Sequence, residues 1–197
     1  MLIGVMGCDS PEESVVVDTD PEVFVSIGEE GAMVGMTEAH NVARAKVDVP
    51  PLEWDDELAG VADDWAEHLA STNGCIMEHR PSKEVDYMEN GQSFTGVGNY
   101  VNGQFIGENL YWEMSSATPT VETAPDNVVE AWESEVADYD YDSNTCAAGK
   151  MCGHYTQVVW EDTTHVGCSY RICDDLGSQV WVCNYHPAGN YVGEKPY

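Results

Sequence analysis

The chain has 197 residues, with 7 Lys plus Arg, 36 Asp plus Glu and a formal net charge of -29. Nucleic-acid-binding proteins neutralise phosphates with basic side chains, so this chain is not expected to bind nucleic acid, nor an anionic membrane through a basic patch. A hydrophobic content of 43% is that of a globular protein. We therefore interpret the acidity as a solvated surface suited to a saline habitat, with cation storage as the alternative.

Residues 1–35 are expected to lie outside the folded domain, as the remnant of an export signal and an acidic linker. The opening MLIGVMGCDS ends an apolar run in Gly-Cys and resembles the end of a bacterial lipoprotein signal. Cys8 is therefore a candidate for lipidation, and a free thiol after a truncated start is an equally open alternative. Residues 9–35 are acidic and interrupted by Pro11 and Pro21, which predicts a linker.

Three amphipathic helices are predicted in the first two thirds of the chain. Thr37 is the expected N-cap of the first helix, whose buried face carries Ala39, Val42 and Ala43. A second helix follows Pro50-Pro51, since apolar residues recur there at helical spacing: Leu58, Val61, Ala62, Trp65, Ala66, Leu69 and Ala70. A third helix opens after Pro125, with Val128, Ala131, Trp132 and Val136 on one face.

The remaining segments predict a long polar loop and then strands. Residues 80–107 are rich in Gly and Asn and are expected to form a surface loop or insertion. The run from Tyr155 to Trp160 is typical of a strand, and two alternating strands flank a turn at residues 174–177. Helices followed by strands indicate an α+β fold with one layered domain.

Six cysteines lie in the last two thirds of the chain, and such an even set indicates three disulfides in an oxidising compartment. No CxxC pair is present, so a zinc knuckle is disfavoured. If residues 174–177 form a hairpin loop, Cys168 falls opposite Cys183 within disulfide range. The geometry leaves the partners of the other four cysteines open.

Four segments in this order resemble the superfamily of cysteine-rich secretory proteins, antigen five and pathogenesis-related group one proteins (the CAP superfamily). They are HNVAR at 40–44, GENLYW at 107–112, GHYTQVVW at 153–160 and CNYHPAGNYVGEKPY at 183–197. WESE at 132–135 and YDSNTC at 141–146 resemble the plant group one members in particular. The resemblance covers residues 36–197 and implies an α-β-α sandwich with a central antiparallel sheet. It also implies that the disulfides Cys75–Cys173 and Cys146–Cys152 accompany Cys168–Cys183.

The resemblance further implies a central cleft that gathers His79, Glu108, Glu135 and His154. The face of the third helix independently favours Glu135 over Glu133 for this role. Tyr155 and Gln157 follow His154 and are expected to line the cleft, with strand packing as the alternative. His40 is expected to be structural, and no role is assigned to His186.

Histidine and carboxylate ligands suit zinc and other divalent first-row ions, so His79 and His154 are the candidate metal ligands. Glu108 and Glu135 would be catalytic only if the cleft is hydrolytic, and a purely structural His/Glu ion network is the alternative. No GxSxG, HExxH or P-loop motif supports catalysis independently.

The family is known for binding and includes proteins that capture sterols, fatty acids or peptides. The resulting prediction is a binding module for a small apolar ligand, such as a lipid or sterol, or for a peptide. The module is expected to be secreted or held in the cell envelope, with membrane contact only through a lipid on Cys8. A metal-dependent hydrolase of the peptidase or esterase kind, using the same cleft, is the alternative. Four aromatic residues are candidates for an apolar groove, with packing in the core as an equally open alternative: Tyr100, Phe105, Tyr111 and Trp112.

Overall fold

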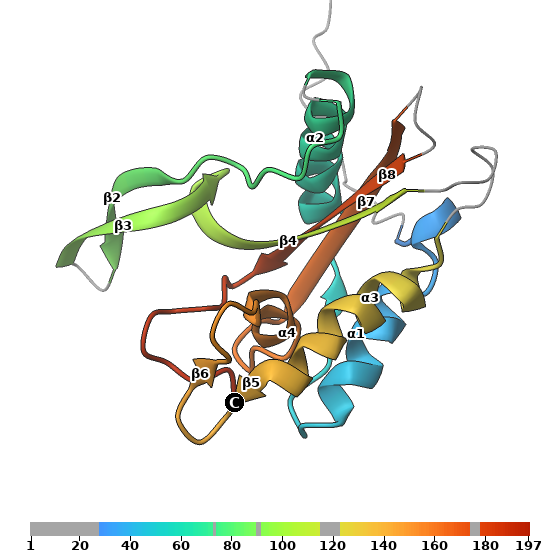
Figure 1. Ribbon diagram of the computed structural model, residues 1–197. Helices are drawn as coiled ribbons and strands as arrows, with labels where there is room; N and C mark the ends of the chain where they lie inside the picture. Colours follow the sequence, from blue (N-terminus) through green and yellow to red (C-terminus); the bar gives the residue numbers. More distant parts are fainter. Residues whose placement is uncertain (1–27, 73, 90–91, 115–122, 174–177) are drawn as a thin grey trace, which may run out of the picture.

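The computed structural model describes residues 28–197 except 73, 90–91, 115–122 and 174–177 (Figure 1). Cys8, most of the acidic linker and the turn at 174–177 lie outside the described residues. The described helices are α1 (Met36–Ala45), α2 (Asp56–Thr72), α3 (Pro125–Glu133) and α4 (Gly153–Val158), with short 3-10 helices η1 (Gly31–Met33) and η2 (Ser134–Asp138). The strands are β1 (Glu53–Trp54), β2 (Lys83–Glu89), β3 (Gln92–Val101), β4 (Gln104–Met114), β5 (Tyr139–Asp140), β6 (Thr145–Cys146), β7 (His165–Cys173) and β8 (Ser178–His186).

A central sheet separates two layers of helices, which confirms the α-β-α sandwich. The strand order is β1-β7-β8-β4-β3-β2, and β5 pairs with β6 in a separate two-stranded sheet. The sheet is mixed, because β1 pairs with β7 in parallel while the other neighbours are antiparallel. Figure 1 shows α2 on one side of β7 and β8, and α1, α3 and α4 on the other.

Two apolar clusters fill the space between these layers. The α2 side is packed by Ala62, Trp65, Ala66 and Leu69 of the predicted stripe against Leu110 of β4 and Val180 and Val182 of β8. The opposite side is packed by α1, α3 and α4 against alternate residues of the same strands, including Cys168, Trp181, Cys183 and Tyr185. Successive strand residues point to opposite faces, so both faces of β8 are buried.

All three expected disulfides are present. Cys168 and Cys183 are directly opposite in the β7–β8 ladder, with Cα atoms 4.1 Å apart, as the hairpin register predicts. Cys75 just after α2 is bonded to Cys173 at the end of β7. Cys146 of β6 is bonded to Cys152, the residue before α4.

The prediction of a loop over residues 80–107 is wrong, because β2 and β3 pair along their length in this segment. The hairpin projects from the body of the domain (Figure 1). β3 returns to β4 through Asn102-Gly103, whose φ angles of 49° and 88° are those of a two-residue hairpin turn. Asn-Gly is a strong hairpin signal, but the polar, Gly-rich composition of residues 80–107 is also typical of a loop.

The predicted strand at Tyr155–Trp160 is also wrong, because Gly153–Val158 forms the helix α4. Tertiary contacts satisfy both ends of this short helix. The Glu135 carboxylate accepts hydrogen bonds from the backbone N–H groups of His154 and Tyr155. The Arg44 guanidinium donates to the carbonyl of Val158 at the other end. These contacts override the strand preference of the β-branched and aromatic residues.

Arg44 ties α1 to the segment that contains α4. It is fully buried and donates to the carbonyl oxygens of Pro50 (2.6 Å), Val158 (2.9 Å), Trp160 (2.8 Å) and Thr163 (3.0 Å). Burial lowers the pKa of Arg44 to about 10, so the side chain is charged at neutral pH. No carboxylate of the described residues pairs with Arg44, and the buried cation is tolerated because several carbonyl dipoles solvate it.

Three details of the predicted helices are corrected. Gly35, and not Thr37, is the N-cap of α1, and the Glu29 carboxylate accepts hydrogen bonds from the N–H groups of both residues (2.8 and 2.5 Å). Val42 is exposed because the buried stripe of α1 runs through Met36, Ala39, His40 and Ala43. Val136 is exposed because the chain passes into η2 at Ser134, which changes the rotation per residue.

Candidate functional site

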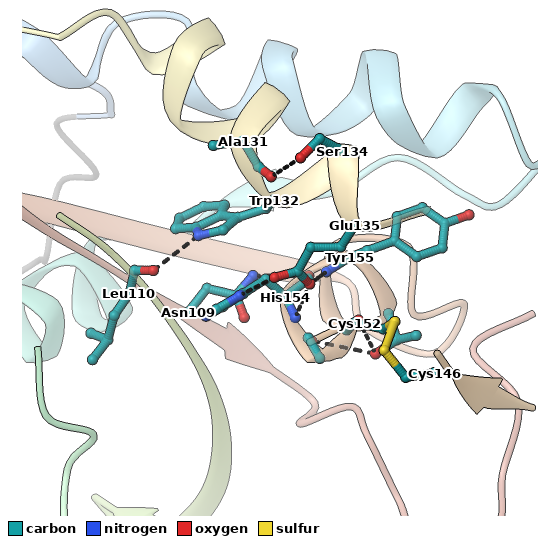
Figure 2. Close-up of polar contacts among 12 residues, drawn as sticks. Asn109, Leu110, Ala131, Trp132, Ser134, Glu135, Cys146, Cys152, His154 and Tyr155 are labelled. Carbon is teal, nitrogen blue, oxygen red and sulfur yellow. Dashed lines mark hydrogen bonds and ion pairs between the residues drawn. A yellow bond between two sulfur atoms is a disulfide. The ribbon is translucent and has the colours of Figure 1, made fainter. Parts of the chain in front are cut away.

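His154 and Glu135 form the first of two histidine–glutamate pairs (Figure 2). His154 Nδ1 lies 2.6 Å from Glu135 Oε1, while Oε2 accepts the backbone N–H groups of His154 (3.0 Å) and Tyr155 (3.1 Å). Burial acts to raise the pKa of Glu135, but the hydrogen bonds from His154 and from the Tyr155 backbone outweigh it, so the pKa lies below its usual value. Glu135 is therefore a carboxylate, and it fixes both the imidazole and the start of α4.

Trp132 completes the surroundings of this pair. Its indole ring stacks on the His154 ring, with centroids 6.3 Å apart and an interplanar angle of 22°. Its Nε1 donates to the carbonyl of Leu110 on β4 at 3.0 Å (Figure 2). The WESE segment thus supplies both a ring that packs against His154 and the carboxylate that bonds to it.

His79 and Glu108 form the second pair. His79 Nδ1 lies 3.0 Å from Glu108 Oε1, which also accepts the backbone N–H of Arg80 at 2.9 Å. The Glu108 side chain is 1% exposed and the His79 side chain 59% exposed. The hydrogen bond to Glu108 raises the pKa of His79, against the opposing effect of burial.

The two pairs approach β4 from its opposite faces. Glu108 and Asn109 are neighbours on the strand and so point to opposite sides of the sheet. Glu108 contacts His79 and Arg80, whereas the Asn109 amide donates to the His154 carbonyl at 3.1 Å. Each histidine is thus brought to one glutamate, and the structure does not bring the four side chains into one group.

This arrangement does not fit a zinc ion held by the four cleft residues. Each imidazole uses Nδ1 on its glutamate, which is how carboxylates orient metal-binding histidines, but a zinc site needs three or four protein ligands. Among the residues that the structure describes, no three or more His, Cys, Asp or Glu side chains are grouped to hold a metal ion.

An open groove lies beside these pairs, between β3, β4, α4 and the loop at residues 188–192. Its volume is about 420 Å³, and it is lined by residues 96–99, 105–108, 157 and 188–192. Glu108 and Gln157 of the predicted cleft line it, whereas His79, His154 and Tyr155 do not. Tyr155 is buried in the core, with its hydroxyl 2.9 Å from that of Tyr197.

Gln157 holds the far wall of the groove in place. Its side chain is buried, accepts the backbone N–H of Gly189 at 3.0 Å and donates to the Thr163 hydroxyl at 3.2 Å. A Cβ on Gly107 would lie 2.1 Å from Gln157 Oε1, so only glycine allows β4 to pass this close. The groove is therefore formed by segments that these hydrogen bonds and this close packing hold together.

Several apolar side chains that line this groove are exposed to solvent. Val97 is 71% exposed, Tyr191 is 51% exposed and Val192 is fully exposed. Of the four aromatic candidates, Phe105 lines the groove and Tyr100 packs edge-on against it, with centroids 4.9 Å apart. Tyr111 packs against the core, and Trp112 is absent from the groove lining.

Two features of the site were not predicted from the sequence: the loop at residues 188–192, and Arg80 as a second partner of Glu108. The loop lies in the CNYHPAGNYVGEKPY segment, whose sequence indicates the family but does not by itself predict a groove wall. Arg80 follows His79 directly, and a basic residue beside a predicted cleft histidine was the available signal for a contact with a buried glutamate.

Comparison with known proteins agrees with this architecture. A family model described as "Cysteine-rich secretory protein family" matches residues 37–185. The chain belongs to this family.

Two plant relatives are similar over most of this CAP domain. Pathogenesis-related protein 1A of Nicotiana tabacum is 42% identical over 160 residues, covering 81% of this chain and 77% of the relative. Pathogenesis-related protein PR-1 of Medicago truncatula is 40% identical over 157 residues, covering 80% and 74%.

Solved structures share the fold at lower identity. The crystal structure of NaASP2 with Zn²⁺ aligns with a TM-score of 0.59 at 22% identity, covering 86% of each chain. That likeness shows the fold alone. Among the described residues, no helix has the length and apolar content needed to cross a membrane.

Proposed function

We propose that this CAP domain is an exported binding module that holds a small amphipathic ligand, of the lipid or sterol kind, in the groove between β3, β4, α4 and residues 188–192. One observation carries the proposal: Val97, Tyr191 and Val192 keep apolar surface in water around a hollow of about 420 Å³. Exposed apolar side chains gathered at a concave surface mark ligand or partner sites.

The lining suits a ligand with an apolar body and one polar end. The volume falls in the range of about 300–1,000 Å³ that small-molecule sites occupy. Val97, Phe105 and Ile106 offer apolar contacts from the strands, and Asn99 and Glu108 offer polar ones. A peptide would instead need an extended run of backbone hydrogen bonds, so its binding is treated as a competing outcome of the test below.

Export is supported by two observations. The structure contains three disulfides, which persist in oxidising compartments. The family model that matches residues 37–185 is described as one of secretory proteins.

A metal-dependent hydrolase remains the alternative from the sequence, and the geometry favours it less. Glu108 and Glu135 each hold one histidine on opposite sides of β4, so no zinc-bound water with a neighbouring base is assembled. Turnover of a peptide and ester library that requires zinc and is suppressed in Glu135→Gln would favour the hydrolase over the binding module.

Two exposed valines of the groove test the proposal against a matched valine elsewhere. Val97→Asp and Val192→Asp are compared with Val34→Asp, since Val34 is 64% exposed and lies outside the groove lining. Binding of a fluorescent sterol and a fluorescent fatty acid is measured by titration. Each groove variant should weaken binding by about tenfold, because losing about 1.5 kcal/mol of apolar burial corresponds to that factor.

The control variant should bind like the unchanged protein. Equal affinities in all four proteins would remove the groove as the ligand site. Displacement of the label by peptides but not by unlabelled lipids would show that the ligand of the groove is a peptide and not a lipid.

A further inference from the structure

Two histidines outside the predicted cleft stand side by side on the sheet. His165 of β7 and His186 of β8 are directly paired in the antiparallel ladder, so their side chains point to the same face. The Cα atoms of such a pair lie about 4.5–5.5 Å apart. Glu53 of β1 pairs with His165 from the other side, so a glutamate and two histidines form one row across three strands.

This row lies on the α2 side of the sheet. Gly167 is one residue further along the same face of β7, and a Cβ there would lie 2.2 Å from the backbone nitrogen of Ala59. α2 thus covers the sheet at Gly167, whereas both histidines remain partly exposed and Glu53 is exposed. Solvent and ions can therefore reach the row.

Hydrogen bonds orient both imidazole rings through Nδ1. His186 Nδ1 lies 3.4 Å from the carbonyl oxygen of Phe105, and His165 Nδ1 lies 2.8 Å from the Thr164 hydroxyl. A carbonyl only accepts, so His186 carries its proton on Nδ1 and presents the lone pair of Nε2. Among the described residues, neither Nε2 atom has a hydrogen-bond or ion-pair partner.

We propose that His165 and His186 bind a divalent transition-metal ion through their two Nε2 atoms, with water in the remaining positions. Two paired imidazoles with water in the other positions suit copper and nickel, whereas a resident zinc site would need a third protein ligand. An outer hydrogen bond on Nδ1 fixes the ring and raises the basicity of Nε2. The affinity order expected for such a site is Cu²⁺ above Ni²⁺ and Zn²⁺.

The site differs from the predicted cleft in its residues and in its charge. His79 and His154 each contact a glutamate through Nδ1, whereas His165 and His186 have neutral partners there and share one face of the sheet. A net charge of -29 also concentrates cations near the protein.

Copper titration of the full chain tests the site. Cu²⁺ is added at pH 7.5 in a weakly competing buffer, with calorimetry for affinity and electron paramagnetic resonance for coordinated imidazole nitrogen. His165→Ala and His186→Ala should each weaken the tightest site by at least about tenfold, since even losing an outer partner of a ligand costs about 10–100-fold. Binding should also weaken in acid, because protons compete with the metal ion for imidazole nitrogen.

Two other histidines serve as controls. His68 is an exposed histidine on α2, and His79 belongs to the predicted cleft. His68→Ala and His79→Ala should leave the tightest site unchanged. His165→Gln and His186→Gln, which keep polar side chains, repeat the test if either alanine variant is poorly folded by circular dichroism.

The proposal is overturned if the His165/His186 double variant binds Cu²⁺ as tightly as the unchanged protein. It is equally overturned if the imidazole signal disappears in His79→Ala and persists in both strand variants.

Discussion

Replacing Arg44 by methionine removes the buried donor that joins α1 to the segment around α4. Methionine keeps most of the side-chain length and the apolar stem, and it cannot donate a hydrogen bond. Four carbonyl oxygens, of Pro50, Val158, Trp160 and Thr163, lose their contact with the guanidinium. The variant therefore isolates the hydrogen bonds and the charge.

The expected cost follows from these four contacts. A buried polar group left without its partner costs about 1–3 kcal/mol, so the lower bound for four carbonyls is about 4 kcal/mol. The guanidinium no longer has to be desolvated, and this gain is why we take the lower bound. For a domain of this size, about 4 kcal/mol corresponds to a fall in Tm of about 8–16 °C.

Urea unfolding and thermal melting measure the effect, with Arg171→Met as the matched control. Arg171 forms ion pairs with Asp63 and Glu67 on the surface of α2, and such partly exposed pairs contribute about 0–1 kcal/mol. If Arg44→Met costs no more free energy of unfolding than Arg171→Met, Arg44 does not stabilise the α4 segment as described.

Three further changes have defined outcomes. Burial lowers the pKa of His40 from 6.5 in the unfolded chain to about 4 in the folded protein, so between these two values the unfolded state binds one more proton. The free energy of unfolding should therefore fall by about 2 kcal/mol from pH 7 to pH 5. In His40→Gln this part of the pH dependence, measured by urea unfolding, should vanish. Gly167→Ala would place a Cβ against the backbone of α2 and should lower Tm. Gly60→Ala is the control, because a Cβ there meets open space and should raise the free energy of unfolding by about 0.5–1 kcal/mol. Equal changes in Tm would show that α2 does not pack this closely on the sheet. Replacing both Cys146 and Cys152 by serine opens a loop with a separation of 6 residues and should cost about 2 kcal/mol in calorimetry, and no loss would mean that this bond does not constrain the unfolded chain.

The elements that the sequence predicts well are those with a long, regular pattern. The stripe from Leu58 to Ala70 spans more than three turns of α2, and the spacing between Cys168 and Cys183 fixes the register of β7 and β8. Both patterns depend on contacts that repeat at one period, so local reasoning is sufficient for them.

The errors occur where contacts distant in sequence decide the local structure. α4 forms from a strand-like sequence because Glu135 and Arg44, which lie outside the helix, stabilise its two ends.

 Glu135 is 20 residues from Tyr155, and Arg44 is 114 residues from Val158. Contacts over these distances leave no periodic signal in the helix that they stabilise.

The start of α1 and the site show the same limit. Thr37 is a reasonable N-cap by residue type, yet the Glu29 carboxylate takes the backbone donors and leaves the Thr37 hydroxyl buried without a partner. The family motifs single out His79 and His154, which lie beside Glu108 and Glu135 respectively. Their separation by β4 depends on the direction in which each side chain leaves the strand, and a motif does not record that direction.

The central claim is that a ligand occupies the groove between β3, β4, α4 and residues 188–192. The most direct test is ¹H–¹⁵N NMR of the assigned protein during titration with a soluble fatty acid or sterol. The amides of residues 96–99 and 189–192 should shift together and saturate at one concentration. Saturable shifts confined instead to the groove between α1 and α3, around Val42 and Val129, would contradict the claim.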